Sequence, residues 1–447
     1  MKVLFLTFSP GYGHTRAAEA IEVALRNYYP DIETESLDVT HLIDANVRAA
    51  VQDGYLRMTT EEPQLYQKLY DMDKDIYRQL AGKMPADINL VEFLAEQQQR
   101  WYPEIAEGPL FSISELYNNL DSALLNSLIN GICNRTKIPV GRLLLQGLLS
   151  LIYSILATRL KNYVNQSAPD LLIATQMYPN ALLSRAIQKN VITQPLIGVL
   201  TDFGAHGVWV RNTTRMYCVS HSAVAESFHQ QGVAAESIHV TGIPLMPEFE
   251  NPPTQARARF NLGLDNRPTI LITGGQCGIG ILDTVKCLVR DDRHSYQILV
   301  AAGNTLAANR ELQHLVEQYP KRFKLYAWRN DMVSLLRAAD VVIGKPGGLT
   351  VAESLACARP FIATCCLGGQ EMHNVKFLQE KGAGFQIEVT DLPDVLHKLF
   401  NNAEELRSMK QAAELHGRRC AAKAVVAQVE TIRLQNDASL IQHHAKI

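Results

Sequence analysis

The sequence predicts an α/β protein with two halves, each made of buried strands that alternate with helices. Along residues 1–40 and 170–245, short apolar runs typical of buried parallel strands alternate with helical patterns. A second series of the same kind begins at Pro268, after the break Pro252-Pro253. The length of 447 residues allows about two to three domains, and 47% hydrophobic with 20% charged residues is an ordinary globular composition.

The N-terminal half opens with a predicted strand at residues 3–7, which ends before a Ser-Pro-Gly turn. This apolar run is too short for a signal peptide, so we expect none. Residues 14–27 carry apolar side chains on one face of a predicted helix. Further strands are predicted at residues 33–39, 171–175, 196–201, 216–219 and 238–241. Together these elements predict a first domain at residues 1–245.

The C-terminal half repeats the alternation. Its strands are predicted at residues 269–273, 297–301, 323–326, 341–343 and 361–364, and a further short strand follows the glycines at 382–384. From residue 403 the chain is rich in Ala, Glu, Lys and Arg, which predicts a helical tail. We therefore expect a second domain at residues 246–447 that includes this tail.

The segment 41–168 does not follow the alternating pattern and is mostly helical in composition. Between residues 122 and 169 it has no Asp or Glu, and residues 143–158 are all uncharged. The same stretch carries five basic residues, namely Arg135, Lys137, Arg142, Arg159 and Lys161. A cationic helical insertion with an apolar face predicts contact with an anionic membrane surface. The alternative is a core helix that happens to lack acidic residues. No window is long enough to predict a membrane span.

Charge and cysteine content exclude other classes. The net charge of −2 provides no positive field for nucleic acid, so we expect no nucleic-acid partner. The eight cysteines form no C-x-x-C pair, which favours reduced thiols in a cytosolic protein over disulfides or a zinc site.

Two loops of the first half carry candidate chemistry. Residues 9–14 read SPGYGH, and because position 16 is Arg, the dinucleotide-binding pattern G-x-G-x-x-G fails at its third glycine. The loop instead presents His14 at a helix start, where an imidazole can accept a proton near neutral pH. The alternative is that His14 caps the helix or binds a phosphate. The other loop, TDFGAHGVW at residues 201–209, presents Asp202, which can orient His14, act as the base itself, or only cap a turn.

The loops of the second half favour a phosphorylated ligand. Gly347 and Gly348 allow backbone amides to approach an anion at a helix start, which we expect at Thr350. The glycine-rich loop 274–280 can cradle a diphosphate in the same way. Glu353 can bind sugar hydroxyls, although Thr350 and Glu353 also fit a capping box. Since loops after parallel strands meet at one sheet edge, these residues predict a site for a nucleotide-diphosphate-sugar.

The segments GKPGGLTVAESLA (344–356) and GGQEMHN (368–374) resemble the donor-site signature of family 28 glycosyltransferases. This family includes monogalactosyl- and processive glucosyl-diacylglycerol synthases and lipid-I N-acetylglucosaminyltransferases. The pattern G-x-G-H resembles the N-terminal motif of the family, and T-D-F-x-x-H-x-x-W resembles its diacylglycerol branch. The resemblance implies the GT-B fold, in which two Rossmann-like domains enclose a cleft. It also implies inverting transfer of a hexose from a UDP-sugar to a lipid hydroxyl, most simply that of diacylglycerol.

Residue roles follow from the same resemblance. His14 is the expected base, with Asp202 as the second candidate, and Glu353 is expected to bind the ribose hydroxyls. Acceptor contacts are expected from Gly13, Phe203, His206 and Trp209, although Trp209 can instead belong to the core. Donor contacts are expected from Gly274, Gly275, Gln276, Arg329, Lys345, Gly347, Gly348, Thr350, Glu353, Gln370, Glu371 and Asn374. We expect no metal ion and no cofactor besides the UDP-sugar substrate.

Three other functions remain open at this point. These are a UDP-N-acetylglucosamine transferase for another lipid or lipopolysaccharide, a UDP-sugar 2-epimerase, and a non-catalytic sugar-nucleotide sensor. A lipid acceptor implies a cytoplasmic protein bound peripherally to the inner face of the cell membrane.

Overall fold

The computed structural model describes residues 1–8, 12–43, 45, 48, 156–291, 293, 296–303 and 309–444, with side chains placed as far as residue 435. Most of the predicted insertion 41–168, including its uncharged run up to residue 155, lies outside the described residues. In the part of the chain that the structure describes, no helix has the length and apolar character needed to cross a bilayer.

The N-terminal domain contains a six-stranded parallel sheet in the order β2-β1-β3-β4-β5-β6. Every residue of β3, β4 and β5 is buried, as the uninterrupted apolar runs predict. The strands are β1 (Lys2–Thr7), β2 (Glu33–Asp38), β3 (Leu171–Ala174), β4 (Leu196–Val199), β5 (Met216–Val219) and β6 (Ile238–Val240). The helices are α1 (Tyr12–Tyr28), α8 (Met177–Gln188) and α9 (Ser222–Gln230), with short 3-10 turns η1 (Val39–Leu42) and η3 (Ala235–Ser237).

The C-terminal domain contains a second six-stranded parallel sheet, in the order β12-β11-β10-β7-β8-β9. Its strands are β7 (Thr269–Thr273), β8 (Gln297–Ala301), β9 (Phe323–Tyr326), β10 (Val341–Gly344), β11 (Phe361–Ala363) and β12 (Gly384–Gln386). Its helices are α10 (Gln255–Asn261), α11 (Ile281–Val289), α12 (Arg310–Glu317), α13 (Met332–Ala338), α14 (Gly348–Ala356), α15 (Gln370–Glu380), α16 (Leu392–Asn401) and α17 (Ala403–His416), with η4 (Pro247–Phe249) and η6 (Val389–Asp391) as 3-10 turns. The two predicted α/β halves are thereby confirmed.

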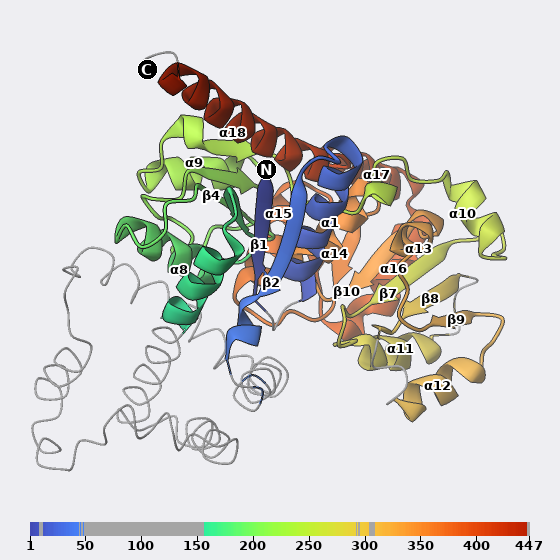
Figure 1. The fold of residues 1–447 in the computed structure, drawn as a ribbon. Helices are drawn as coiled ribbons and strands as arrows, with labels where there is room; N and C mark the ends of the chain where they lie inside the picture. The colour runs from blue at the N-terminus through green and yellow to red at the C-terminus, as the bar shows by residue number, and fades with distance from the viewer. Residues whose placement is uncertain are drawn as a thin grey trace, which may run out of the picture.

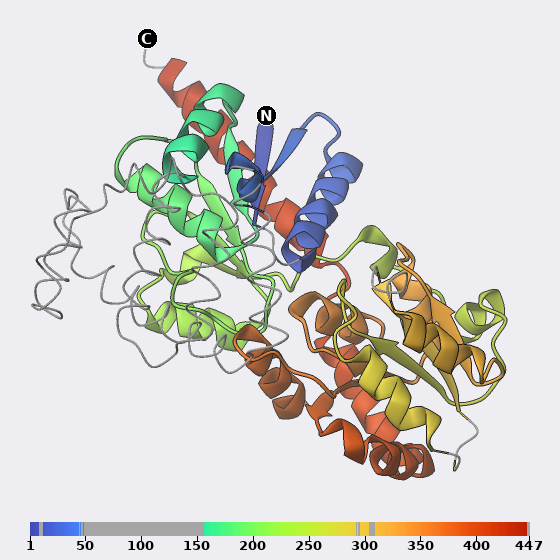
Figure 2. The same cartoon turned by 90° about the horizontal axis from the view of Figure 1, so that it is seen from below.

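The last helix, α18 (Ala421–His444), leaves the C-terminal domain and packs against the N-terminal one. Its residues Val425, Val426 and Val429 are fully buried or nearly so, in one cluster with Ile21 and Leu25 of α1. Figures 1 and 2 show this helix running along the N-terminal domain. The predicted second domain, 246–447, therefore needs correction at its end, because an apolar helix face completes the core of the first domain.

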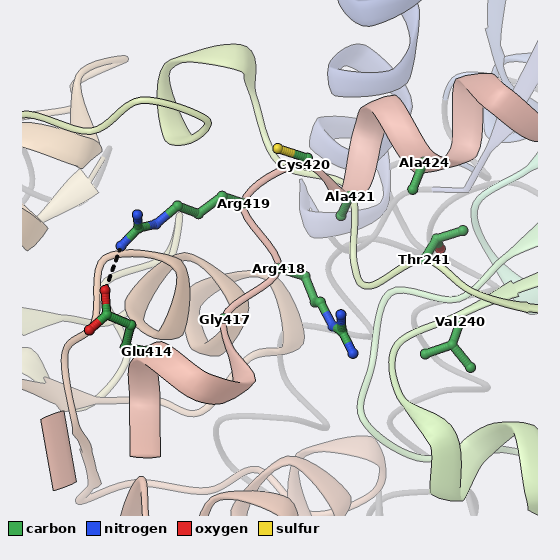
Figure 3. Close-up of a pocket in the computed structure, with 9 residues that line it drawn as sticks. All are labelled: Val240, Thr241, Glu414, Gly417, Arg418, Arg419, Cys420, Ala421 and Ala424. Atoms are coloured by element: carbon green, nitrogen blue, oxygen red, sulfur yellow. Dashed lines mark hydrogen bonds and ion pairs between the residues drawn. The ribbon is translucent and has the colours of Figure 1, made fainter. Parts of the chain in front are cut away.

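The described part of the chain passes between the two domains twice, and the two crossings are neighbours. A Cβ atom added at Gly242, on the first crossing, would lie 2.5 Å from the Cβ atom of Arg418, on the second. A groove of about 430 Å³ lies between them, with Arg418 and Arg419 on one side and Val240 and Thr241 on the other (Figure 3). Both crossings thus form one hinge-like region.

The described end of the predicted insertion belongs to the core of the N-terminal domain. Residues 156–167 are helical, and Leu156, Leu160 and Val164 are buried in one cluster with β1 and β3. For these residues the alternative of a core helix holds.

A candidate active site between the two sheets

His14 lies in the first turn of α1, directly after the loop that follows β1. Its Nδ1 atom is 2.7 Å from Thr201 Oγ1 and 3.2 Å from the carbonyl oxygen of Thr175. Because a carbonyl can only accept, Nδ1 carries the hydrogen and Nε2 keeps a free lone pair. Burial lowers the pKa of His14, while the nearby Asp202 carboxylate acts in the opposite direction. The imidazole is therefore neutral at pH 7, as a general base must be.

Opposite His14, the C-terminal domain presents the start of α14. The helix begins at Gly348 rather than at the expected Thr350, and its N-cap Gly347 has no side chain with which to cap it. The capping-box alternative for Thr350 and Glu353 is therefore wrong, because both residues lie inside the helix. The first amides of α14 remain available to an anion.

The two helix starts meet closely. A Cβ atom at Gly348 would lie 2.0 Å from Thr201 O and 2.6 Å from Asp202 Oδ1. A Cβ atom at Gly13 would lie 3.7 Å from the Cβ atom of Leu349. Two helix N-termini, each with a partial positive charge, thus converge on one junction between the domains. Such a junction favours a diphosphate.

Glu353 lies on α14 beside this junction and is half-buried. Burial raises the pKa of its carboxyl group to about 7, although the Arg16 guanidinium on α1 lowers it and Glu248 raises it further. Arg16 itself forms an ion pair with Glu19 at 2.8 Å, so it acts on Glu353 as a nearby charge and not as a bonded partner. Hydroxyl groups that donate hydrogen bonds to this carboxyl group would lower its pKa and favour its ionised form.

Lys345 and Glu371 form an ion pair next to the same loop. The second carboxylate oxygen of Glu371 accepts a hydrogen bond of 2.9 Å from Leu367 N, and the residue is only 3% exposed. Burial works to lower the pKa of Lys345, but the Glu371 carboxylate outweighs it and the pKa is raised. The structure thus gives Glu371 protein partners where the sequence predicted donor-sugar hydroxyls.

The glycine-rich loop 274–280 lies beside Lys345, whose Cε atom is 3.7 Å from the position of a Cβ atom at Gly275. The loop closes on itself, since Ile279 N donates to Gly274 O at 3.0 Å. Gln276 is exposed at its tip. Gly275 is therefore next to Lys345 of the loop before α14, and the roles of Gly274, Gly275 and Gln276 at the donor stay predictions.

The remaining donor candidates lie around this site. Gln370 is the first residue of α15 and is half-buried, as is Thr350 on α14. Arg329 follows β9, where its guanidinium lies 5.1 Å from the ring centroid of Tyr326 and 3.6 Å from Asp331.

An aromatic contact between the two domains was not predicted from the sequence. Tyr12, at the start of α1, meets Trp328 of the loop after β9 with ring centroids 5.1 Å apart and an interplanar angle of 81°. Trp328 is 40% exposed. Because the two residues are far apart in the sequence, only the packing of the domains reveals the pair.

Three acceptor candidates need correction. Phe203, His206 and Trp209 are 8%, 3% and 7% exposed, so they do not form an open surface for a lipid. Phe203 is covered by the C-terminal domain and Trp209 belongs to the core beside Tyr217, which is the alternative stated for it. His206 Nδ1 accepts a hydrogen bond of 3.3 Å from Val208 N. Asn374, expected at the donor, is fully buried and bonded to protein groups.

Among the described residues, no group of three or more His, Cys, Asp and Glu side chains is arranged to hold a metal ion.

Comparison with known proteins defines the class. The solved structure of MurG from Acinetobacter baumannii resembles the chain with a TM-score of 0.53 and 15% identity, covering 96% of this chain and 100% of that one. The UDP-GlcNAc 2-epimerase of Neisseria meningitidis, bound to UDP-GlcNAc, gives a TM-score of 0.54 with 12% identity, again covering 96% and 100%. These likenesses show the fold: two facing parallel α/β domains of the GT-B type.

Family comparisons go further. The family model for monogalactosyldiacylglycerol (MGDG) synthase matches residues 117–245, and the model for the glycosyltransferase family 28 C-terminal domain matches residues 269–430. The chain belongs to this family of glycosyltransferases. It is 29% identical over 257 residues to the processive diacylglycerol beta-glucosyltransferase of Bacillus pumilus, and 28% identical over 263 residues to that of Bacillus subtilis. These matches cover 57% and 56% of the chain and 66% and 68% of the relatives.

Proposed function

We propose that this protein is an inverting glycosyltransferase that moves a hexose from a UDP-sugar to a lipid hydroxyl, most simply that of diacylglycerol. The observation that carries the proposal is the junction at which His14 of one domain faces the glycine-rich start of α14 of the other. Membership in the family and the glucosyltransferase relatives support a UDP-sugar donor and a lipid acceptor.

In the proposed reaction, the acceptor oxygen attacks the anomeric carbon from the face opposite the UDP. The new carbon–oxygen bond forms as the bond to the β-phosphate oxygen breaks, and UDP leaves with the electron pair. His14 Nε2 takes the proton of the acceptor hydroxyl, since Nδ1 is occupied by Thr175 and Thr201. The amides at Gly347 and Gly348 and the dipole of α14 stabilise the leaving diphosphate.

Donor recognition divides among several groups. Glu353 binds the ribose hydroxyls, Gln370 binds the hexose, and Lys345 offsets phosphate charge. The loop 274–280 closes over the diphosphate. We also propose that the protein binds peripherally to the inner face of the cell membrane through the basic residues of the insertion, which lie mostly outside the described part of the chain.

The decisive experiment incubates the protein with labelled UDP-glucose, UDP-galactose or UDP-N-acetylglucosamine over vesicles that contain diacylglycerol and anionic lipid. Hexosyl-diacylglycerol made from a UDP-hexose, with activity retained in EDTA, supports the proposal. Transfer from UDP-N-acetylglucosamine alone, or epimerised sugar nucleotide without any lipid, overturns it. Binding of UDP with no product from any lipid favours the sensor function.

Membrane binding is tested separately by co-sedimentation with vesicles. Binding to anionic vesicles that survives replacement of Arg135, Lys137 and Arg142 by Gln contradicts the electrostatic part of the proposal.

A further inference from the structure

The loop at residues 201–204, named here the docking loop, follows a strand of the N-terminal sheet, but its Phe203 side chain is buried in the core of the C-terminal domain. It follows β4, and its Phe203 ring stacks on Phe377 of α15 with centroids 4.3 Å apart at 25°. A Cβ atom at Gly204 would lie 2.3 Å from the ring of His373. The docking loop therefore fixes how the two domains face each other at the candidate site.

Asn374 connects this loop to the donor side. Its Oδ1 accepts a hydrogen bond of 2.8 Å from Phe203 N, while its Nδ2 donates to Pro346 O at 2.9 Å and to Asp202 Oδ1 at 3.2 Å. The side chain is fully buried. Both N–H groups of the amide are thus used by protein acceptors, so neither is left to donate to a sugar hydroxyl.

The three hydrogen-bond partners of Asn374 come from both domains. Pro346 is in the loop between β10 and α14, where the diphosphate is proposed to bind. Asp202 is the carboxylate whose charge raises the pKa of His14 against the effect of burial. The backbone of Asp202 is held independently from the N-terminal domain, because Ser220 Oγ donates to its carbonyl at 2.8 Å. Only its carboxylate is held from the other domain.

We infer that Asn374 is a positioning residue that acts on the base through Asp202 and links the geometry of the phosphate loop to that of His14. This inference rests on the proposed function and assigns Asn374 no contact with the donor. When the domains are docked, the amide holds the carboxylate of Asp202, and the adjacent Thr201 places its Oγ1 atom 2.7 Å from His14 Nδ1.

The test compares Asn374→Ala with Lys376→Ala, an exposed position on the same helix whose side chain is 72% exposed. We expect Asn374→Ala to lower kcat by about tenfold to a hundredfold, because hydrogen bonds that involve a charged group are lost. The KM for the UDP-sugar and the affinity for UDP should stay within about threefold of the wild type. The acidic limb of the kcat/KM profile should move to lower pH, since His14 loses the carboxylate that raises its pKa. Lys376→Ala should change none of these quantities.

A second variant reaches the same contact from the other side. In Gly348→Ala the added methyl group collides with Thr201 O and Asp202 Oδ1, so it should also shift the acidic limb. Together with Asn374→Ala its effect should be less than additive, because both variants displace the same carboxylate.

The outcomes separate the possible failures. A raised KM with unchanged kcat and pH profile makes Asn374 a donor ligand and overturns the inference. A lower melting temperature with unchanged kcat and pH profile makes it merely structural and overturns it as well. If the wild-type protein neither binds UDP nor transfers sugar, it is the proposed function that fails.

Discussion

At the scale of single residues, His14 owes its chemistry to its neighbours. The carbonyl of Thr175 fixes its tautomer and burial lowers its pKa from the ordinary value of 6.5. Both effects keep Nε2 unprotonated at neutral pH. The sequence predicted the residue from its place after a glycine turn, but its partners come from strands far along the chain.

We expect His14→Ala to lower kcat by about a hundredfold to ten-thousandfold, the usual contribution of a general base. Calorimetry should show UDP affinity close to that of the wild type, because the ring is not assigned to the donor. The wild-type kcat/KM should fall only below pH 6.5, where the imidazole gains a proton. Turnover retained in the variant would remove the catalytic role.

Glu353 predicts that the affinity for UDP depends on pH. Its carboxyl pKa is raised from 4.5 to about 7, so the unliganded protein is partly protonated there at neutral pH. Ribose hydroxyls would donate to the ionised form, so UDP affinity should rise between pH 5.5 and 8 and binding should release a proton below pH 7. Calorimetry in two buffers of different ionisation enthalpy measures that proton. Glu353→Gln should abolish the dependence, and a flat wild-type profile would contradict the assignment.

The same shift has a defined sign for stability. The folded protein holds this proton more tightly than the unfolded chain, so the contribution of Glu353 is fully present below pH 4.5 and is lost as the pH rises toward 7.

At the scale of elements, the turn between β10 and α14 depends on glycine. Gly344 has φ 146°, and a Cβ atom there would lie 1.7 Å from Thr273 O on the neighbouring strand. No side chain other than hydrogen fits this approach, so the strand can end beside β7 and deliver its loop to the site.

We expect Gly344→Ala to destabilise the protein by more than about 4 kcal/mol, or to prevent folding, since backbone must move. Gly382→Ala is the matched control: Gly382 has φ 64° with open space around it, so the cost should be about 1 kcal/mol. Thermal unfolding of both variants makes the comparison. Equal losses of stability in the two variants would show that the positive φ angle, rather than the collision with Thr273 O, sets the cost at Gly344.

Most strands were predictable from the sequence because buried parallel strands are short, apolar and separated by turns. The start of α14 was less so, because the pattern Thr350–Glu353 mimics a capping box while the true start uses backbone amides alone. The roles of Phe203 and Trp209 were not predictable from local pattern. An aromatic residue after a strand end looks the same whether a ligand, the core or another domain covers it.

At the scale of the whole molecule, α18 joins the end of the chain to its beginning. The apolar face of this helix packs beside α1 and covers part of the N-terminal core. The stability of the first domain therefore depends on residues that follow the second domain in the sequence.

We expect Val429→Asp to destabilise the protein by more than about 3 kcal/mol, because a carboxylate without a partner would be buried in the N-terminal core. Leu434→Asp is the control on the same helix, since Leu434 is 58% exposed, and its effect should stay within about 0.5 kcal/mol. Denaturant unfolding measures both. Similar losses of unfolding free energy in the two variants would show that α18 does not stabilise the first domain.

The adjacent crossings at Gly242 and Arg418 also have a consequence for how such proteins diversify. The residues between the two crossings leave the first domain and return to it at adjacent points, so they form an inserted domain whose two ends lie side by side. Recombination at these two points would exchange the C-terminal sheet and its helices in one piece and leave the first sheet and α18 intact. Under the proposed function, such an exchange would change the sugar donor while the acceptor side kept its structure.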